Sequence, residues 1–177
     1  TIQKMVKNKL KNNVELYTRY GVNQVPFNSF LCCMASLKKI TLRELISRII
    51  KNLTPDEFID LNNGDIFRMF VKYDQVLQED KLQSFSNWKN EYSEFSRNKK
   101  EDFLVKVYYS FENFKNYCSD MNVQKEPIFF QDLLSKRNDW FFQNGLNILI
   151  VERKIIASKE KLYLHVPQIE NIDNLYD

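Results

Sequence analysis

Two adjacent thiols, Cys32 and Cys33, are the residues of this sequence best suited to chemistry. They follow a turn in which Asn28 or Ser29 can cap a helix, so both fall near the start of that helix. A helix N-terminus carries about half a positive charge and therefore stabilises a thiolate, the reactive form of cysteine. The spacing permits a nucleophilic thiol. Free cysteine is also among the most buried residue types, so both side chains could instead fill a packed helix.

Thiol chemistry needs an imidazole partner, and His165 is the single histidine of the chain. Asn171 or Asp173 could supply the third member of a triad. Zinc normally needs about four ligands from cysteine, histidine and acids, and this set falls short. We therefore predict no metal and no cofactor, and we commit to no catalytic residue. Cys32, Cys33 and His165 form the alternative, catalytic set.

The helix that would position the thiols is predicted over residues 29–38. Apolar residues recur on all its sides, so it should run through the middle of the domain with both cysteines buried: Phe30, Leu31, Met34, Ala35 and Leu37.

The rest of the chain is predicted to be helical first and extended last. Capping signals at Thr41 (with Glu44), Thr54 and Asp65 start three helices, and Gly145 separates the helices from two short strands. The sequence thus predicts an α+β fold, mostly helical with a small C-terminal antiparallel sheet. The predicted helices cover 42–52, 55–61, 65–73, 79–97, 101–120 and 129–136, and the strands cover 146–151 and 161–166.

Composition favours one globular domain over residues 1–177, with 44% hydrophobic and 28% charged residues and a net charge of +3. A start at Thr1 suggests an excerpt of a longer polypeptide. Cys118 adds a third thiol without forming a disulfide framework, and no signal peptide or 18-residue apolar run is present. We therefore expect an intracellular protein that does not enter a membrane. Basic residues cluster at the N-terminus only (Lys4, Lys7, Lys9, Lys11), which leaves a nucleic-acid accessory domain as an alternative.

The order of elements resembles the OTU (ovarian-tumour) group of papain-like cysteine proteases, which mostly remove ubiquitin. In that group an Asp-Gly-Asn-Cys-Leu-Phe segment leads into a buried helix, and late strands carry a histidine. Here Phe27-Asn-Ser-Phe-Leu31 occupies the first place, and Gly145-Leu-Asn-Ile-Leu-Ile-Val151 resembles the step into the family's final sheet. Ser29 stands where the family has its catalytic cysteine, and Val166 and Pro167 follow His165 instead of an aromatic residue.

This resemblance implies an OTU-like fold without the family's active site, a pseudoenzyme that makes contacts with another protein or with other domains of the same chain. The alternative it implies is an active thiol hydrolase, a deubiquitinase that uses Cys32 or Cys33 with His165. Two of the same stretches and the Asn/Lys-rich composition also resemble long, uncharacterised proteins of large DNA viruses. That likeness implies a viral protein located in the host cytoplasm or the virion.

Overall fold

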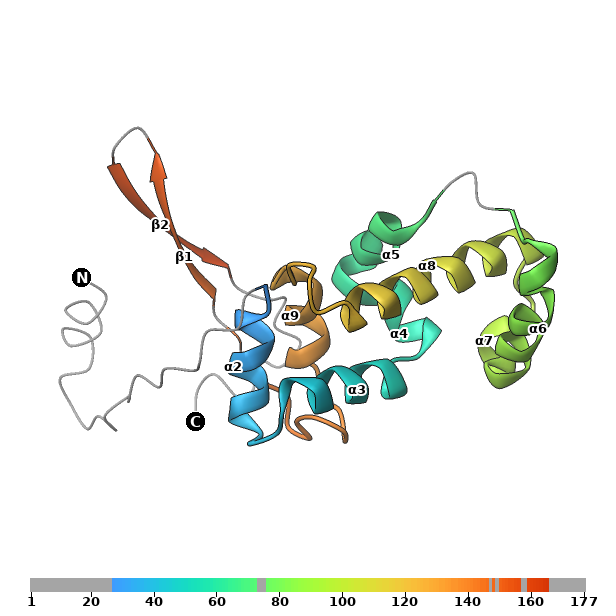
Figure 1. The fold of residues 1–177 in the computed structure, drawn as a ribbon, viewed down its shortest axis with the longest axis horizontal. Helices are drawn as coiled ribbons and strands as arrows, with labels where there is room; N and C mark the ends of the chain where they lie inside the picture. Colours follow the sequence, from blue (N-terminus) through green and yellow to red (C-terminus); the bar gives the residue numbers. More distant parts are fainter. Residues whose placement is uncertain (1–26, 73–75, 147, 149, 157–158, 166–177) are drawn as a thin grey trace.

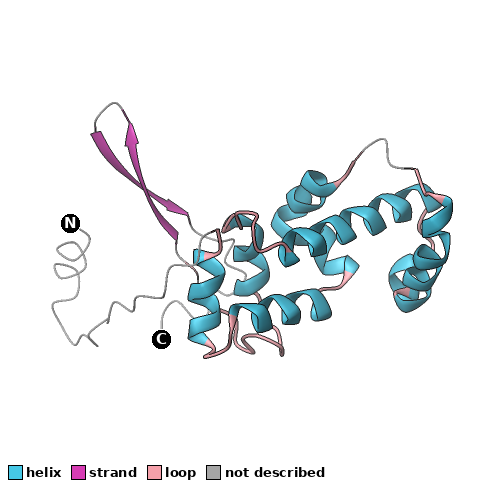
Figure 2. Cartoon of the chain, in the orientation of Figure 1, coloured by secondary structure: helices cyan, strands magenta, loops and turns pink. Residues whose placement is uncertain are grey.

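The computed structural model describes residues 27–72, 76–146, 148, 150–156 and 159–165. They form a body of helices and, after it in the chain, one antiparallel hairpin that extends away from the body (Figure 1, Figure 2). The α+β class is therefore confirmed. The helices are α2 (Ser29–Leu37), α3 (Leu42–Asn52), α4 (Pro55–Asp60), η1 (Leu61–Gly64), α5 (Asp65–Phe70), η2 (Glu79–Lys81), α6 (Leu82–Glu91), α7 (Ser93–Ser96), α8 (Glu101–Ser119) and α9 (Ile128–Ser135), and the strands are β1 (Ile150–Ile156) and β2 (Lys159–His165).

Two predicted threonine caps start their helices. The Thr41 hydroxyl accepts from the Glu44 amide at 3.1 Å, but the Glu44 carboxylate pairs with Arg48 instead of reaching back. At Thr54 the capping box is complete, because the Glu57 amide donates to the hydroxyl at 3.3 Å and the Thr54 amide donates to the carboxylate at 2.9 Å. These local bonds fix where α3 and α4 begin.

The turn between α4 and α5 is left-handed over three successive residues. Asn62 and Asn63 have φ of 48° and 56°, and Gly64 has φ of 85°. Asparagine and glycine tolerate this region best, which explains why the sequence carries both here. The predicted cap residue, Asp65, is the first residue of α5, and Gly64 takes the cap position.

The long helix α8 forms the axis of the body, with other helices packed along it (Figure 1). The fully buried ring of Phe58 on α4 meets two α8 rings, with centroids 5.4 Å from Phe111 and 5.3 Å from Phe114. The ring of Phe130 on α9 also contacts Phe114, with the two centroids 6.0 Å apart. Large aromatic side chains therefore join α4, α8 and α9 into one core.

Two predicted helices end or break earlier than expected. α5 stops at Phe70, because Val71 turns extended (φ −71°, ψ 131°), so the predicted extension to residue 73 is wrong. The predicted helix over 79–97 is interrupted at Tyr92, whose φ and ψ of −106° and 48° separate α6 from α7. The Tyr92 ring packs edge-on against Phe111 at 6.2 Å, and this tertiary contact accompanies the break.

The first strand begins later than predicted. Leu146 and Ile148 stay against the helical body, because the Leu146 amide donates to the Ser135 carbonyl at 2.9 Å and the Ile148 carbonyl accepts from the Gln131 side chain at 3.0 Å. β1 starts at Ile150, and its pairing with β2 confirms the predicted antiparallel hairpin. Gly145 precedes this stretch with φ of 75°, and a Cβ there would lie 2.9 Å from the Ser135 carbonyl oxygen.

Candidate functional site

The two adjacent cysteines of α2 have opposite surroundings. Cys32 is 9% exposed and belongs to the buried side of the helix, whereas Cys33 is exposed to solvent. Ser29, Cys33 and Leu37 follow one another at four-residue spacing and form an exposed stripe. The prediction that α2 is buried on all sides, with both cysteines inside, is therefore wrong for Cys33 and for Leu37.

Burial makes the Cys32 thiol harder to deprotonate, which disfavours a role as a nucleophile. Desolvation first, and the neighbouring Cys33 second, raise the pKa of the Cys32 thiol above its ordinary value. Asn28 precedes α2 but its amide donates to the Met121 carbonyl at 3.2 Å, and it makes no side-chain cap on the helix. The start of α2 thus serves to attach this helix to the segment after α8.

The predicted imidazole partner lies at the end of the hairpin. The backbone of His165 closes β2 opposite Ile150, and its side chain lies outside the described residues. Asn171 and Asp173 also lie outside them. Within the described residues, no group of three or more histidine, cysteine, aspartate or glutamate side chains is placed to hold a metal ion.

A buried lysine that sequence reasoning missed ties the loop after α8 to the start of α2. Lys125 is only 3% exposed. Its ammonium group donates hydrogen bonds to the Asp120 carbonyl and to the Val123 carbonyl, the latter at 2.7 Å. The same group lies 4.7 Å from the centroid of the Tyr117 ring. Its amide donates to the Phe27 carbonyl at 2.7 Å. Desolvation lowers the pKa of Lys125. All these bonds hold the backbone, so we assign Lys125 a structural role.

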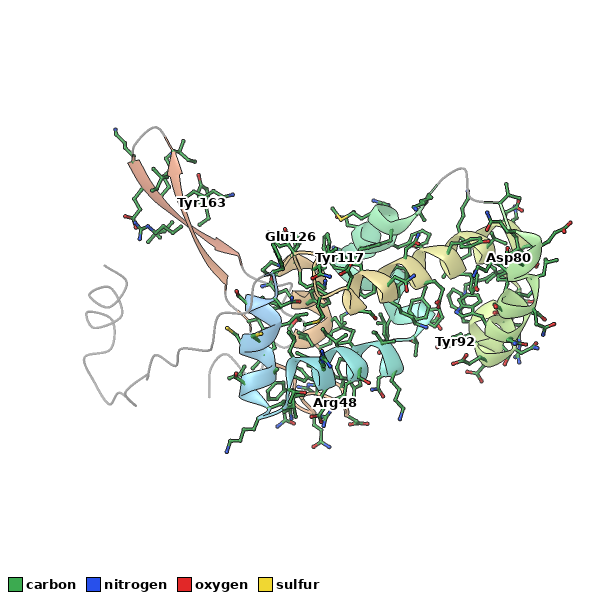
Figure 3. All side chains as sticks on the ribbon, in the orientation of Figure 1. Arg48, Asp80, Tyr92, Tyr117, Glu126 and Tyr163 are labelled. Carbon is green, nitrogen blue, oxygen red and sulfur yellow. The ribbon has the colours of Figure 1, made fainter. Side chains whose placement is uncertain are left out.

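The hairpin is the part of the described chain with the most exposed apolar surface for its size. Ile155 is 72% exposed and Leu162 is 48% exposed, and Ile156 and Tyr163 are also exposed. Among the described residues, neither strand packs extensively against any helix. Figure 3 shows Tyr163 on the hairpin, far from the labelled side chains of the body. A two-stranded hairpin is only marginally stable alone in water, so this element is suited to binding.

The register divides the hairpin into two faces of different character. On one face, Arg153 lies opposite Leu162 and Ile155 lies opposite Glu160, and the Arg153 guanidinium pairs with the Glu160 carboxylate at 3.1 Å. We call this the apolar face, because Arg153 and Glu160 neutralise each other's charge and Ile155 and Leu162 leave aliphatic surface exposed beside them.

The second face of the hairpin is basic. By register it carries three lysines and one glutamate, Glu152, together with Tyr163 and Ile156, since alternate residues of a strand share a face; the lysines are Lys154, Lys159 and Lys161. The ammonium group of Lys154 lies 5.4 Å from the centroid of the Tyr163 ring. We call this the basic face. The alternation that produces both faces is visible in residues 159–163 of the sequence, where Lys, Glu, Lys, Leu and Tyr follow one another.

Comparison with known proteins identifies no relative of this chain. No protein-family model, no curated protein and no solved structure matches it. The resemblance to OTU domains therefore stays a prediction. In the part of the chain that the structure describes, no helix is both long enough and apolar enough to cross a lipid bilayer.

Proposed function

We propose that this domain is a non-catalytic module that binds another protein through the β1–β2 hairpin. The observation that supports this proposal is the exposure of Ile155 and Leu162 on a hairpin that extends away from the helical body (Figure 1). Burying one such aliphatic side chain fully contributes about 1.5–3 kcal/mol. A partner that covers the apolar face would therefore stabilise both the complex and the hairpin itself.

Two features of the thiols support a binding role over a catalytic one. The buried Cys32 has a raised pKa, which disfavours the thiolate that a nucleophile needs. The chain also holds a single histidine, His165, so only one imidazole is available to activate either thiol. A ubiquitin-derived electrophilic probe should therefore leave both thiols unlabelled, and stoichiometric labelling of either would contradict the non-catalytic role.

Site-specific photo-crosslinking tests the binding role. A photoreactive residue placed in the full chain at position 155 or 162 should give discrete protein adducts. The same residue at Met69, which is 65% exposed on α5, should give none. The adducts should persist in a chain that also carries Lys159→Glu, because Lys159 lies on the basic face and not on the apolar face. Equal adducts from position 69, or none from 155 and 162, would overturn the proposal.

A second candidate function rests on the basic face, where Lys154 and Lys161 lie next to the exposed Tyr163 and Lys159 lies further along the same face. This arrangement fits nucleic acid, because lysines neutralise phosphates and an aromatic ring can stack on a base. If each of the three lysines contacts one phosphate of double-stranded DNA, the binding constant should fall about 40-fold as the salt concentration rises from 50 to 200 mM. Fluorescence anisotropy at the two salt concentrations measures this ratio, and binding that is absent or independent of salt would exclude this function.

A further inference from the structure

The outer edge of β1 carries backbone groups that the hairpin leaves available. Within the described residues the sheet consists of β1 and β2 alone, so each strand pairs on one side. An exposed strand edge presents a row of N–H and C=O groups and is a template for pairing with another strand. Natural sheets protect such edges unless they use them. A partner of this domain can therefore bind by adding a strand.

The residues of β1 form a sequence that is complementary to itself. β1 reads Ile-Val-Glu-Arg-Lys-Ile-Ile from residue 150 to residue 156. If two β1 strands pair antiparallel about Arg153, positions 150 and 156 bring isoleucine opposite isoleucine, and positions 151 and 155 bring valine opposite isoleucine. Positions 152 and 154 bring glutamate opposite lysine, twice in the pair. Apolar and opposite-charge pairs across an antiparallel pair of strands are stabilising.

We propose that the partner of the hairpin is a second copy of this chain, joined through the β1 edges about a two-fold axis at Arg153. The product is a four-stranded sheet in the order β2–β1–β1–β2. This inference rests on the proposed function, because it names the partner of the same hairpin. A two-fold interface uses one patch twice, and such isologous dimers are the commonest protein oligomers. Four strands also exceed the number at which a sheet becomes stable.

The central arginine is compatible with this arrangement. Two copies of Arg153 would face each other on the axis, but each guanidinium already pairs with Glu160 of its own hairpin at 3.1 Å. Among the described residues, the hairpin extends away from the helices (Figure 1).

The edge of β2 is less suited to the same pairing. Antiparallel pairing of two β2 strands about Leu162 would bring Lys159 opposite histidine, Glu160 opposite leucine and Lys161 opposite tyrosine. None of these is an opposite-charge pair. In the register centred on its middle residue, β2 therefore lacks the opposite-charge pairs that β1 forms, which favours β1 as the joining edge.

Charge exchange in the full chain tests the proposed pairing. Sedimentation velocity should show the mass of the wild-type chain rising with concentration from 21.3 kDa toward twice that value. Glu152→Lys alone and Lys154→Glu alone each replace both opposite-charge pairs by like-charge pairs, so each should weaken the dimer by about tenfold or more. Lys159→Glu makes the same charge change outside the proposed interface and should leave the dimer intact.

The two single variants should rescue each other. In their mixture, each lysine of Glu152→Lys meets a glutamate of Lys154→Glu, so a heterodimer should form at concentrations where neither variant self-associates. The double variant, E152K with K154E, should also regain the homodimer. Cross-strand NOEs between positions 154 and 161 in each variant verify that the hairpin is still formed.

Three results would overturn the inference. A wild-type chain that stays monomeric at millimolar concentration has no such dimer, while crosslinks from position 155 to a different protein would still support the proposed function. A dimer that is insensitive to both charge variants does not use this register. Salt-sensitive DNA binding by a monomeric chain would assign the hairpin to nucleic acid. Failure of the crosslinks and of the dimer together would remove the proposed function as well.

Discussion

The three thiols should differ in reactivity by orders of magnitude, in the order of their exposure. Cys118 is fully buried on α8, and burial raises its pKa from 9.0 to about 12. At pH 8 this shift reduces the thiolate fraction about a thousandfold. Cys32 has a raised pKa and 9% exposure, and Cys33 is exposed. Native chain should therefore show one thiol reacting quickly, at Cys33, followed by slow reaction at the other two.

DTNB titration at pH 8 measures this order directly. The native chain should release one equivalent of thionitrobenzoate in a fast phase, and denaturant should release the remaining two. Cys33→Ser should abolish the fast phase, whereas Cys118→Ser, a matched control, should retain it. The reasoning would be refuted if Cys118 reacted as fast as Cys33 in the native chain, or if the fast phase survived in Cys33→Ser.

Three further predictions concern stability. Cys32→Ser should lower the free energy of unfolding by about 1–3 kcal/mol because it buries a hydroxyl, whereas Cys33→Ser should change it by less than about 0.5 kcal/mol. Equal values for the two variants in urea titrations would contradict the different burial of the two thiols. Phe58→Ala should cost about 3–5 kcal/mol, since its fully buried ring contacts Phe111 and Phe114, and a loss below about 1 kcal/mol would mean that α4 does not pack on α8 as described. Raising the pH should destabilise the fold, because burial holds the pKa of Cys118 at about 12 in the folded state, whereas the unfolded thiol releases its proton from about pH 9. Between pH 8 and pH 10 the free energy of unfolding should therefore fall by about 1 kcal/mol more in the wild type than in Cys118→Ala. Equal losses in the two chains would refute this assignment.

The sequence predicted the helices well wherever their ends are set by local bonds. Thr54 with Glu57, and Thr41, act through atoms three residues apart, so capping signals locate α3 and α4 correctly. The interruption at Asn62 was likewise predictable, since asparagine and glycine favour the left-handed region. Local chemistry was sufficient at these positions.

Prediction failed where a contact distant in sequence decides the structure. Ile148 lies in an apolar run typical of a strand, but its carbonyl accepts a hydrogen bond from Gln131 and the chain stays against α9. Lys125 would be expected at the surface, and only the carbonyls after α8 and the Tyr117 ring explain its burial. Cys33 is exposed because the described residues cover only the side of α2 that carries Leu31, Cys32, Met34 and Ala35. Hydrophobic periodicity cannot reveal which side is covered when nearly all residues of the helix are apolar.

The attachment of α2 has a consequence for synthesis on the ribosome. The Asn28 amide bonds to the Met121 carbonyl, 93 residues later in the chain. At translation rates of 5–20 residues per second, α2 waits about 5–20 s before this acceptor has been made. During that interval α3, which contacts α2 in the finished domain, has already been made and can cover part of the side of α2 that carries Leu31 and Met34. Until translation passes residue 125, this contact with α3 is therefore the described packing on which the buried side of α2 depends.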